Sequence, residues 1–330
     1  MQCLDTMLQT FVHPYTKNAL KKDLEGNLLD EGNAGTVFKN YDGCYDFCVA
    51  NPDIIKARNA YDNFYGRGQT SKLSISDVTS PWFDKIVPWR KTMLESIGPL
   101  KGRKVLLLGN GESYIEFYFL LLGASVVFTD LSLVAARRAQ AVFRNSQLWE
   151  TYQERMEFHS VDAMHLPFPD QTFDVVYGTK FVGFLPDREA FFAEVSRVLK
   201  PGGKCRFCDD AYSPAWEAVK RKLVHPVKTH LLRRAMSSLG KVRADSLFGF
   251  KEEALAPYLR ACGFSRLVFL REYFFLRVAQ LSWATLLGWS PRRERFARPL
   301  FLMMKWIDQR LARSSWVQRN RLALTWGFDK

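Results

Sequence analysis

The chain has 330 residues, a formal net charge of +13 at pH 7, 47% apolar residues and six cysteines. That length suits one large α/β domain with an appendage, and so few cysteines in so long a chain exclude a small disulfide-stabilised domain. The chain opens without a signal-peptide pattern, so we expect a cytoplasmic protein with free thiols.

The first fifty residues predict a small β module, because short apolar runs alternate there with Gly and Asn. The run Phe11-Val-His-Pro-Tyr-Thr16 and the turn Tyr41-Asp-Gly43 resemble the zinc-ribbon-like fold of the tRNA-methyltransferase activator subunit, which also occurs fused ahead of bacterial methyltransferases. His13 stands where that fold has a cysteine ligand, so we expect no bound metal. Cys44 and Cys48 have no second pair with matching spacing nearby, and we interpret them as ordinary thiols.

Two helices are predicted next, over residues 52–66 and 84–96. Apolar residues recur in the first at helical spacing, and Gly66-Arg-Gly68 ends it. A helix directly ahead of a nucleotide-binding unit often covers the ligand. Tyr61 and Tyr65 could therefore close over a bound nucleotide, or could pack against the domain instead.

A strand, a glycine turn and a helix form the centre of the prediction. Val105 to Leu108 indicates a buried strand that breaks at Gly109-Asn110-Gly111 into a helix over 114–122. Glycine permits positive φ and the close approach of a ligand, and the amides at a helix start carry partial positive charge. A second strand, 124–129, ends at Asp130, where a carboxylate can accept both hydroxyls of a ribose. The pattern indicates a nucleoside-binding unit.

The rest of the chain alternates strands with helices. Ser132 is a plausible N-cap for the helix that follows Asp130, and Lys200-Pro-Gly-Gly203 predicts a tight turn between a helix and a strand. Further helices are predicted over 131–140, 187–199 and 251–261, and further strands over 156–161, 174–178, 204–209, 265–270 and 321–328. Strands joined by helices predict a parallel sheet covered on both faces.

Three motifs together resemble the class I S-adenosylmethionine-dependent methyltransferases, in the subgroup that includes the quinone-biosynthesis enzymes. They are Gly109-Asn-Gly111, Asp162-Ala-Met-His-Leu-Pro-Phe-Pro-Asp170 with Phe173-Asp-Val-Val176, and Arg197-Val-Leu-Lys-Pro-Gly-Gly203. The resemblance implies an α/β fold with a Rossmann-like seven-stranded sheet and helices on both faces. We expect the small β module at 1–50, the methyltransferase domain at 51–330, and helical cap insertions in that domain at 211–247 and 273–320.

The resemblance also implies S-adenosyl-L-methionine as the cofactor and a set of residues that would bind it. The methionine part would lie along the glycine turn, one carboxylate would hold the ribose, the other would meet the adenine, and a glycine backbone would line the sulfonium. The glycine turn is Gly109, Asn110 and Gly111. Asp130, with Leu131, would hold the ribose, and Asp162, with Ala163, would meet the adenine. The backbone of Gly178 would line the sulfonium, and Tyr65 would cover the ligand.

The glycine motif departs from the family pattern at two positions. Leu107 and Ser113 stand where the family usually has an acid and a third glycine. The departures motivate an alternative, a catalytically degenerate methyltransferase fold that serves as a binding or scaffold protein. A dinucleotide-dependent dehydrogenase is disfavoured, because its third glycine is needed for close packing and Tyr114 stands there instead.

Methyl transfer itself needs no metal, and for an oxygen or nitrogen acceptor a general base helps. The candidates lie near the carboxyl ends of the fourth and fifth strands and in the first insertion: Lys180, Tyr212 and His225, with Asp210 and His230 beside them. Cys205 and Cys208 suggest a redox pair, but their odd spacing within a strand sends them to opposite faces. We interpret both as packing residues.

The C-terminal third is basic and rich in tryptophan. Residues 211–321 hold 22 Lys and Arg against 7 acids, and six of the nine tryptophans lie beyond residue 210. The apolar run 278–289 is too short to span a bilayer, and a following helix places one apolar face at Leu300, Met303, Met304, Ile307 and Leu311. The segment 273–320 fits a peripheral membrane contact, a lid over a hydrophobic small molecule, or a homodimer contact.

The sequence therefore predicts a methyltransferase, cytoplasmic or membrane-associated, that acts on a small hydrophobic acceptor of lipid-like or anionic character. Whether it methylates oxygen, nitrogen or carbon stays open. Nucleic acid is not expected as a substrate, because Gly178-Thr-Lys-Phe181 lacks the Asn/Asp-Pro-Pro-aromatic motif that holds a flipped base.

Overall fold

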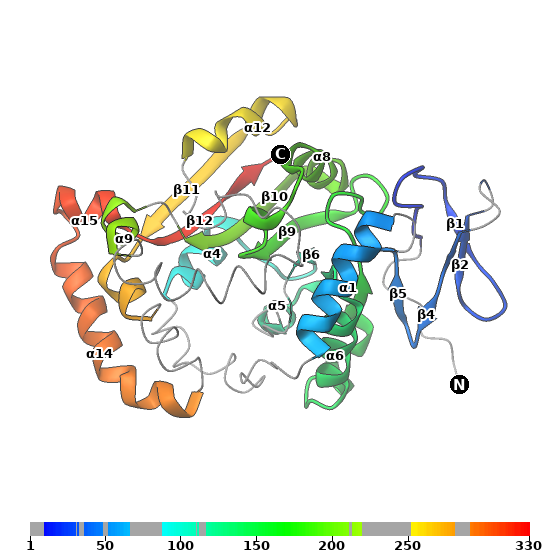
Figure 1. The fold of residues 1–330 in the computed structure, drawn as a ribbon, viewed down its shortest axis with the longest axis horizontal. Helices are drawn as coiled ribbons and strands as arrows, with labels where there is room; N and C mark the ends of the chain where they lie inside the picture. The colour runs from blue at the N-terminus through cyan, green and yellow to red at the C-terminus, as the bar shows by residue number, and fades with distance from the viewer. Residues whose placement is uncertain are drawn as a thin grey trace.

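The computed structural model describes residues 10–30, 32, 36–48, 52–66, 88–109, 111, 117–210, 213–219, 252–280 and 291–330. Its centre is a nine-stranded sheet with the order β11-β12-β10-β9-β6-β7-β8-β5-β4 (Figure 1). The strands are β4 (Asn40–Tyr41), β5 (Cys44–Asp46), β6 (Lys104–Leu108), β7 (Ser125–Asp130), β8 (Met156–Ser160), β9 (Phe173–Thr179), β10 (Leu199–Asp210), β11 (Arg266–Glu272) and β12 (Ala323–Asp329).

The strands β6 to β10 run parallel, and β12 lies antiparallel between β10 and β11. These seven strands confirm the predicted Rossmann-like α/β sheet. The largest boundary difference is in β10, which begins at Leu199 and includes the predicted turn at 200–203. A register shift against β9 between Leu199 and Lys204 accommodates those residues, so the turn is an irregularity within the strand.

Helices cover both faces of the sheet (Figure 1). Ser132 caps α6 as predicted, its Oγ accepting a hydrogen bond from the amide of Ala135. The predicted helix 251–261 is shorter, a 3₁₀ turn η5 (Glu252–Ala254) followed by α12 (Ala256–Ala261). The other helices are α1 (Pro52–Gly66), α4 (Trp89–Ile97), α5 (Phe117–Leu121), α6 (Leu133–Arg144), α7 (Trp149–Tyr152), α8 (Arg188–Val198), α9 (Pro214–Val219), α14 (Pro291–Arg310) and α15 (Ser315–Asn320), with 3₁₀ turns η2 (Gln153–Arg155) and η3 (Val182–Phe184).

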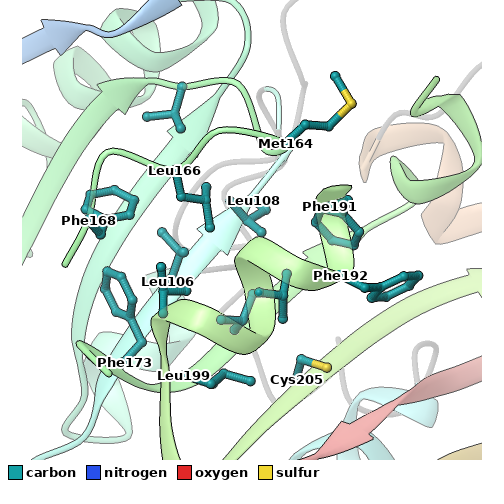
Figure 2. Packing of buried hydrophobic residues seen from close by; sticks show 14 of the residues in the cluster. Leu106, Leu108, Met164, Leu166, Phe168, Phe173, Phe191, Phe192, Leu199 and Cys205 are labelled. Atoms are coloured by element: carbon teal, nitrogen blue, oxygen red, sulfur yellow. The ribbon is translucent and has the colours of Figure 1, made fainter. Parts of the chain in front are cut away.

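Successive residues of β6 point to opposite faces and enter two separate apolar cores. Leu106 and Leu108 lie in the core that contains Phe191 and Phe192 of α8 (Figure 2). Leu107 lies in the opposite core, with residues of α4, α5 and α6, and is fully buried. An apolar side chain at position 107 therefore belongs to the core on that face.

The N-terminal segment is tied to the main sheet. Strands β1 (Leu20–Lys22), β2 (Leu28–Asp30) and β3 (Val37–Phe38) form a small sheet of their own, but β5 pairs in parallel with β8, and β4 pairs with β5. His13 is buried, and its Nδ1 accepts hydrogen bonds from the amides of Tyr15 and Thr16. Within the described part of the chain, no group of three or more His, Cys, Asp or Glu could hold a metal ion. The division at residue 50 stays a prediction.

The helix predicted around residues 300–311 is α14, a 20-residue helix. Its expected apolar face is turned outward: Leu300, Met303 and Leu311 are exposed. The face turned to the protein carries Ala297, Phe301 and Asp308, all buried. No helix among the described residues is long and apolar enough to cross a membrane.

Candidate functional site

The candidate site lies at the carboxyl edge of the parallel strands. Gly109 follows β6, Asp130 ends β7, and Asp162 comes two residues after β8. The chain order reverses between β6 and β9, which are neighbours in the sheet. Open α/β sheets bind ligands at such a reversal, outside the carboxyl ends of the strands.

The turn after β6 requires glycine at two positions. Gly109 and Gly111 have φ angles of 62° and 56°, a region that residues with a Cβ rarely adopt. A Cβ on Gly109 would lie 2.5 Å from the Phe181 ring, and one on Gly111 would collide with the Tyr65 hydroxyl. The turn therefore presents bare backbone to aromatic side chains from two other segments.

Asp130 joins this turn to the next strand. Its Oδ2 accepts a hydrogen bond from the amide of Gly111 at 2.8 Å, and its Oδ1 accepts one from the amide of Ser132 at 2.8 Å. The side chain is buried, at 6% exposure. A carboxylate is the kind of group that accepts hydrogen bonds from ribose hydroxyls.

Asp162 lies on the neighbouring strand end, as predicted. The amide of Val161 donates to the carbonyl of Asp130 at 2.8 Å, which fixes the two acidic segments side by side. Asp162 Oδ1 accepts from the amide of Met164, and Oδ2 is 2.8 Å from His165 Nδ1. Tyr15, from the N-terminal segment, packs on His165 with ring centroids 4.3 Å apart.

Helix α1 covers the edge that carries Asp130, in agreement with its predicted place. Asp62 Oδ1 accepts hydrogen bonds from Ser132 Oγ at 2.5 Å and from the amide of Val134 at 3.1 Å. Burial, and secondarily the negative charge of Asp130, raises the pKa of Tyr61. Together with Tyr65 at Gly111, these contacts bring both predicted tyrosines to the site. Sequence reasoning missed Asp62, whose signal was its spacing of three residues from Tyr65 on the covering helix.

Phe181 forms the wall beside Gly178 and was also missed. A Cβ on Gly178 would collide with the Phe181 ring and lie 2.8 Å from the Leu108 carbonyl. The ring makes edge contacts with Phe191 and Phe207, at centroid distances of 5.5 and 6.0 Å. Its position follows from Lys180, whose φ of 55° turns the chain sharply after β9. The only signal in the sequence was an aromatic residue three positions after the glycine.

The predicted catalytic residues are placed only in part. Lys180 is exposed and directly follows β9. Tyr212, His225 and His230 lie outside the described residues, as does Asn110 among the cofactor residues. Asp210 ends β10, and its side chain is not described. Leu131 and Ala163 are half-buried beside their acidic neighbours.

The four cysteines singled out from the sequence are buried. Cys205 and Cys208 lie in the two separate cores, on opposite faces of β10, as their spacing predicted. Burial raises the pKa of Cys44 and of Cys205 to about 12, and raises that of Cys48 as well. Such thiols are protonated at neutral pH and pack as small apolar groups.

These residues fit a nucleoside with an amino-acid tail. Two buried carboxylates near adjacent strand ends supply acceptors for hydroxyl and amine groups. Gly109, Gly111 and Gly178 leave no room for a Cβ, because the Phe181 ring or the Tyr65 hydroxyl lies directly against each of them. Glycines of this kind let a ligand approach the main chain closely. The donor set is that of an S-adenosylmethionine site.

Comparison with known proteins supports this assignment. Residues 106–207 match the family model described as "Methyltransferase domain". The demethylmenaquinone methyltransferase of Streptomyces griseus is 28% identical over 189 residues, which are 54% of this chain and 75% of that protein. The ubiquinone/menaquinone biosynthesis C-methyltransferase UbiE of Dinoroseobacter shibae is 27% identical over 210 residues, 59% and 79% of the two chains.

A solved structure, the Haemonchus contortus phosphoethanolamine N-methyltransferase 2 in complex with S-adenosyl-L-methionine, has a TM-score of 0.46 and 15% identity, covering 82% of this chain and 59% of that one. That likeness is too weak to support a conclusion. The family match spans the glycine turn and both carboxylates. Residues 106–207 therefore form a methyltransferase domain, and S-adenosylmethionine is its cofactor.

Proposed function

We propose that the chain transfers a methyl group to a small apolar acceptor, of quinone-like or lipid-like character. The observation that carries the proposal is the Phe181 ring, which packs over Gly109 and Gly178 where the reactive end of the cofactor is expected. An aromatic wall excludes water and favours an apolar partner. The printed names of the two relatives, which concern menaquinone and ubiquinone precursors, point to the same class of acceptor.

The residues of the chain would bind, orient and enclose the reactants. When bound, S-adenosylmethionine supplies a methyl group on a positively charged sulfur. Asp130 and Asp162 would hold the nucleoside, and Tyr61 and Tyr65 on α1 would cover it. The Phe181 face would lie beside the cationic centre, an arrangement that cation–π attraction favours.

The proton acceptor is a separate proposal. We propose three groups for that role: Lys180, which directly follows β9, and Tyr212 and His225 in the first insertion. A carbon acceptor such as an electron-rich ring would need base assistance only after the methyl is transferred. An oxygen or nitrogen acceptor would need it during transfer.

Titration calorimetry followed by a labelling assay tests the proposed function. The full chain should bind S-adenosylhomocysteine and should transfer tritiated methyl from S-adenosylmethionine into the organic-soluble fraction of a cell extract. The site variant for comparison is Asp130→Asn, which should lose most of the binding to S-adenosylhomocysteine and most of the methyl labelling. Label confined to protein or nucleic acid would contradict the proposed acceptor. Absence of binding heat would favour the scaffold alternative, which the family match otherwise disfavours.

A further inference from the structure

Helix α14 is held against the protein by one face only. Ala297 and Phe301 on that face are 1% exposed, and Asp308 is 5% exposed. The two oxygens of Asp308 accept hydrogen bonds from the amides of Phe274, Phe275 and Leu276 at 2.9, 3.1 and 2.9 Å. These contacts fix the rotation of α14 about its axis, so the opposite face is fixed as well.

That opposite face is apolar and open. Phe296, Met303 and Trp306 are 83%, 50% and 55% exposed, and their spacing of seven and three residues places them on one stripe away from Phe301. Of the twelve large apolar side chains that are exposed in the described part of the chain, seven lie between residues 296 and 316. Scattered exposed apolar residues are ordinary, but a stripe of this kind marks an interaction surface.

The charge around the stripe is positive. The sequence of α14 contains six Arg or Lys and two acids, and one of those acids, Asp308, faces the protein. Arg310 lies over the Trp306 ring at 5.1 Å from its centroid, and Arg313 and Arg319 beyond it are exposed. Tryptophan with arginine on an apolar helix face is typical of the interface of an anionic bilayer. Apolar side chains and arginine on the same helix face match the two layers of such a bilayer, its acyl boundary and its phosphates.

The helix also lies at the carboxyl edge of the sheet. Strand β11 ends at Glu272 opposite Ala323, where β12 begins, and Ala323 also pairs with Asp210 at the end of β10. The helices α14 and α15 connect these ends, at the opposite end of the molecule from the small β1–β3 sheet (Figure 1). A surface that holds α14 would therefore lie nearer the edge with Gly109 and Asp130 than the edge where the strands begin.

We propose that the exposed face of α14 docks on an anionic lipid membrane and that the acceptor reaches the site from that membrane. The second half of this inference rests on the proposed function, and the first half does not. The helix would lie in the plane of the interface with Phe296, Met303 and Trp306 in the acyl boundary and arginine beside the lipid phosphates. The protein would bind peripherally, through this helix.

Vesicle co-sedimentation of the full-length protein tests the docking surface. The protein should pellet with phosphatidylcholine vesicles that contain phosphatidylglycerol, and far less with phosphatidylcholine alone or at high salt. The double change Met303→Glu with Trp306→Glu should lower the partition coefficient by about tenfold or more. Arg310→Glu should lower it by roughly tenfold, because two units of charge change near the lipid surface.

The control is Leu24→Glu, an apolar-to-glutamate change at the most exposed large apolar side chain of the described residues, in the turn between β1 and β2. This variant should pellet like the wild type. Docking through α14 is overturned if the wild type stays in the supernatant, or if the Met303/Trp306 variant pellets as well as the wild type. It is also overturned if ultracentrifugation shows a dimer that this variant dissociates while neither protein binds vesicles, since a second copy would then cover the stripe.

A second measurement separates this proposal from the proposed function. The Met303/Trp306 variant should bind S-adenosylhomocysteine like the wild type and should methylate a membrane-lipid extract dissolved in detergent. With the same extract in vesicles, its labelling should fall about tenfold with its membrane binding. Equal labelling of vesicles by both proteins would overturn delivery from the membrane. If the wild type pellets with vesicles but binds no S-adenosylhomocysteine, the proposed function is wrong and the proposed docking surface is still supported.

Discussion

Asp130 Oδ2 accepts a hydrogen bond from the amide of Gly111 at 2.8 Å, across nineteen residues of chain. One carboxylate thereby fixes the glycine turn after β6 and remains the natural acceptor for ribose hydroxyls. The cofactor site and the local fold depend on the same oxygen atoms.

Asp130→Asn should weaken binding of S-adenosylhomocysteine by about 10- to 100-fold, since a charge-assisted hydrogen bond contributes about 1.5–3 kcal/mol. The NH₂ group that replaces one oxygen cannot accept a hydrogen bond, so one of the two backbone amides, of Gly111 or of Ser132, loses its acceptor. Titration calorimetry measures the affinity, and a urea titration gives the folded fraction. Asp170→Asn, the same change at a carboxylate that is 72% exposed, is the control and should bind normally. An affinity for Asp130→Asn within twofold of the wild type would contradict the assigned role.

Glu194 should make the protein acid-sensitive. Burial acts to raise the pKa of Glu194, but hydrogen bonds from Arg197 and Lys17 outweigh it and hold the pKa below its usual value near 4.5. Burial lowers the pKa of Lys17 despite the bond, so we take Arg197 as the main partner. The pKa of Glu194 is lower in the folded state than in the unfolded state. The ionised Glu194 carboxylate therefore stabilises the fold fully at a pH above its ordinary pKa, and this stabilisation is lost as the pH falls through the lowered, folded-state pKa.

Glu194→Gln should lower the free energy of unfolding by about 3 kcal/mol at pH 7. The difference in free energy of unfolding between the variant and the wild type, the gap, should narrow below about pH 4.5. Urea denaturation from pH 7 to pH 3 measures it. Glu95→Gln is the control, because its pair with Lys91 is exposed on both sides and should contribute less than about 0.5 kcal/mol. A gap that stays constant with pH would show that the charge of Glu194 is not what stabilises the fold.

The parallel sheet was predictable because its strands are continuous apolar runs, and each run is followed by a segment whose apolar residues recur at helical spacing. The glycine turn and the two acids were predictable because they follow β6, β7 and β8 directly. Strands β4 and β5 were not predictable as part of the main sheet. Strands of two and three residues are too short to show an alternation of apolar and polar residues, and only the pairing of β5 with β8 defines them. Both strands extend the main sheet, and the division of the chain at residue 50 stays a prediction.

Two further features of the structure were not predicted, for physical reasons. Apolar residues lie on both faces of α14, so periodicity predicted the helix but could not tell which face is buried; the acid Asp308 proved to lie inside because three amides bind it. Phe181 reaches the site only through the left-handed backbone at Lys180, which no propensity of lysine indicates.

Gly178→Ala should lower the free energy of unfolding by about 1–3 kcal/mol, because a Cβ there meets the Phe181 ring and the Leu108 carbonyl. In a Phe181→Ala background the same change should cost less, since only the backbone contact remains. Denaturation of the four proteins in this cycle measures the coupling. Gly66→Ala is the control, because nothing lies within 4 Å of its Cβ position. Equal costs in both backgrounds would mean that Phe181 does not pack on Gly178.

Asp308→Ala should loosen the attachment of α14. Three buried amides, of Phe274, Phe275 and Leu276, lose their acceptor, and we expect a loss of about 2–3 kcal/mol in unfolding free energy. Amide hydrogen exchange should accelerate at 274–276 and along α14 while β6 and β7 stay protected. Asp187→Ala removes an exposed cap that accepts from one amide of α8, and should cost only about 1 kcal/mol without affecting α14. Unchanged exchange at 274–276 would show that Asp308 does not hold these amides, and with them the orientation that turns Met303 and Trp306 outward.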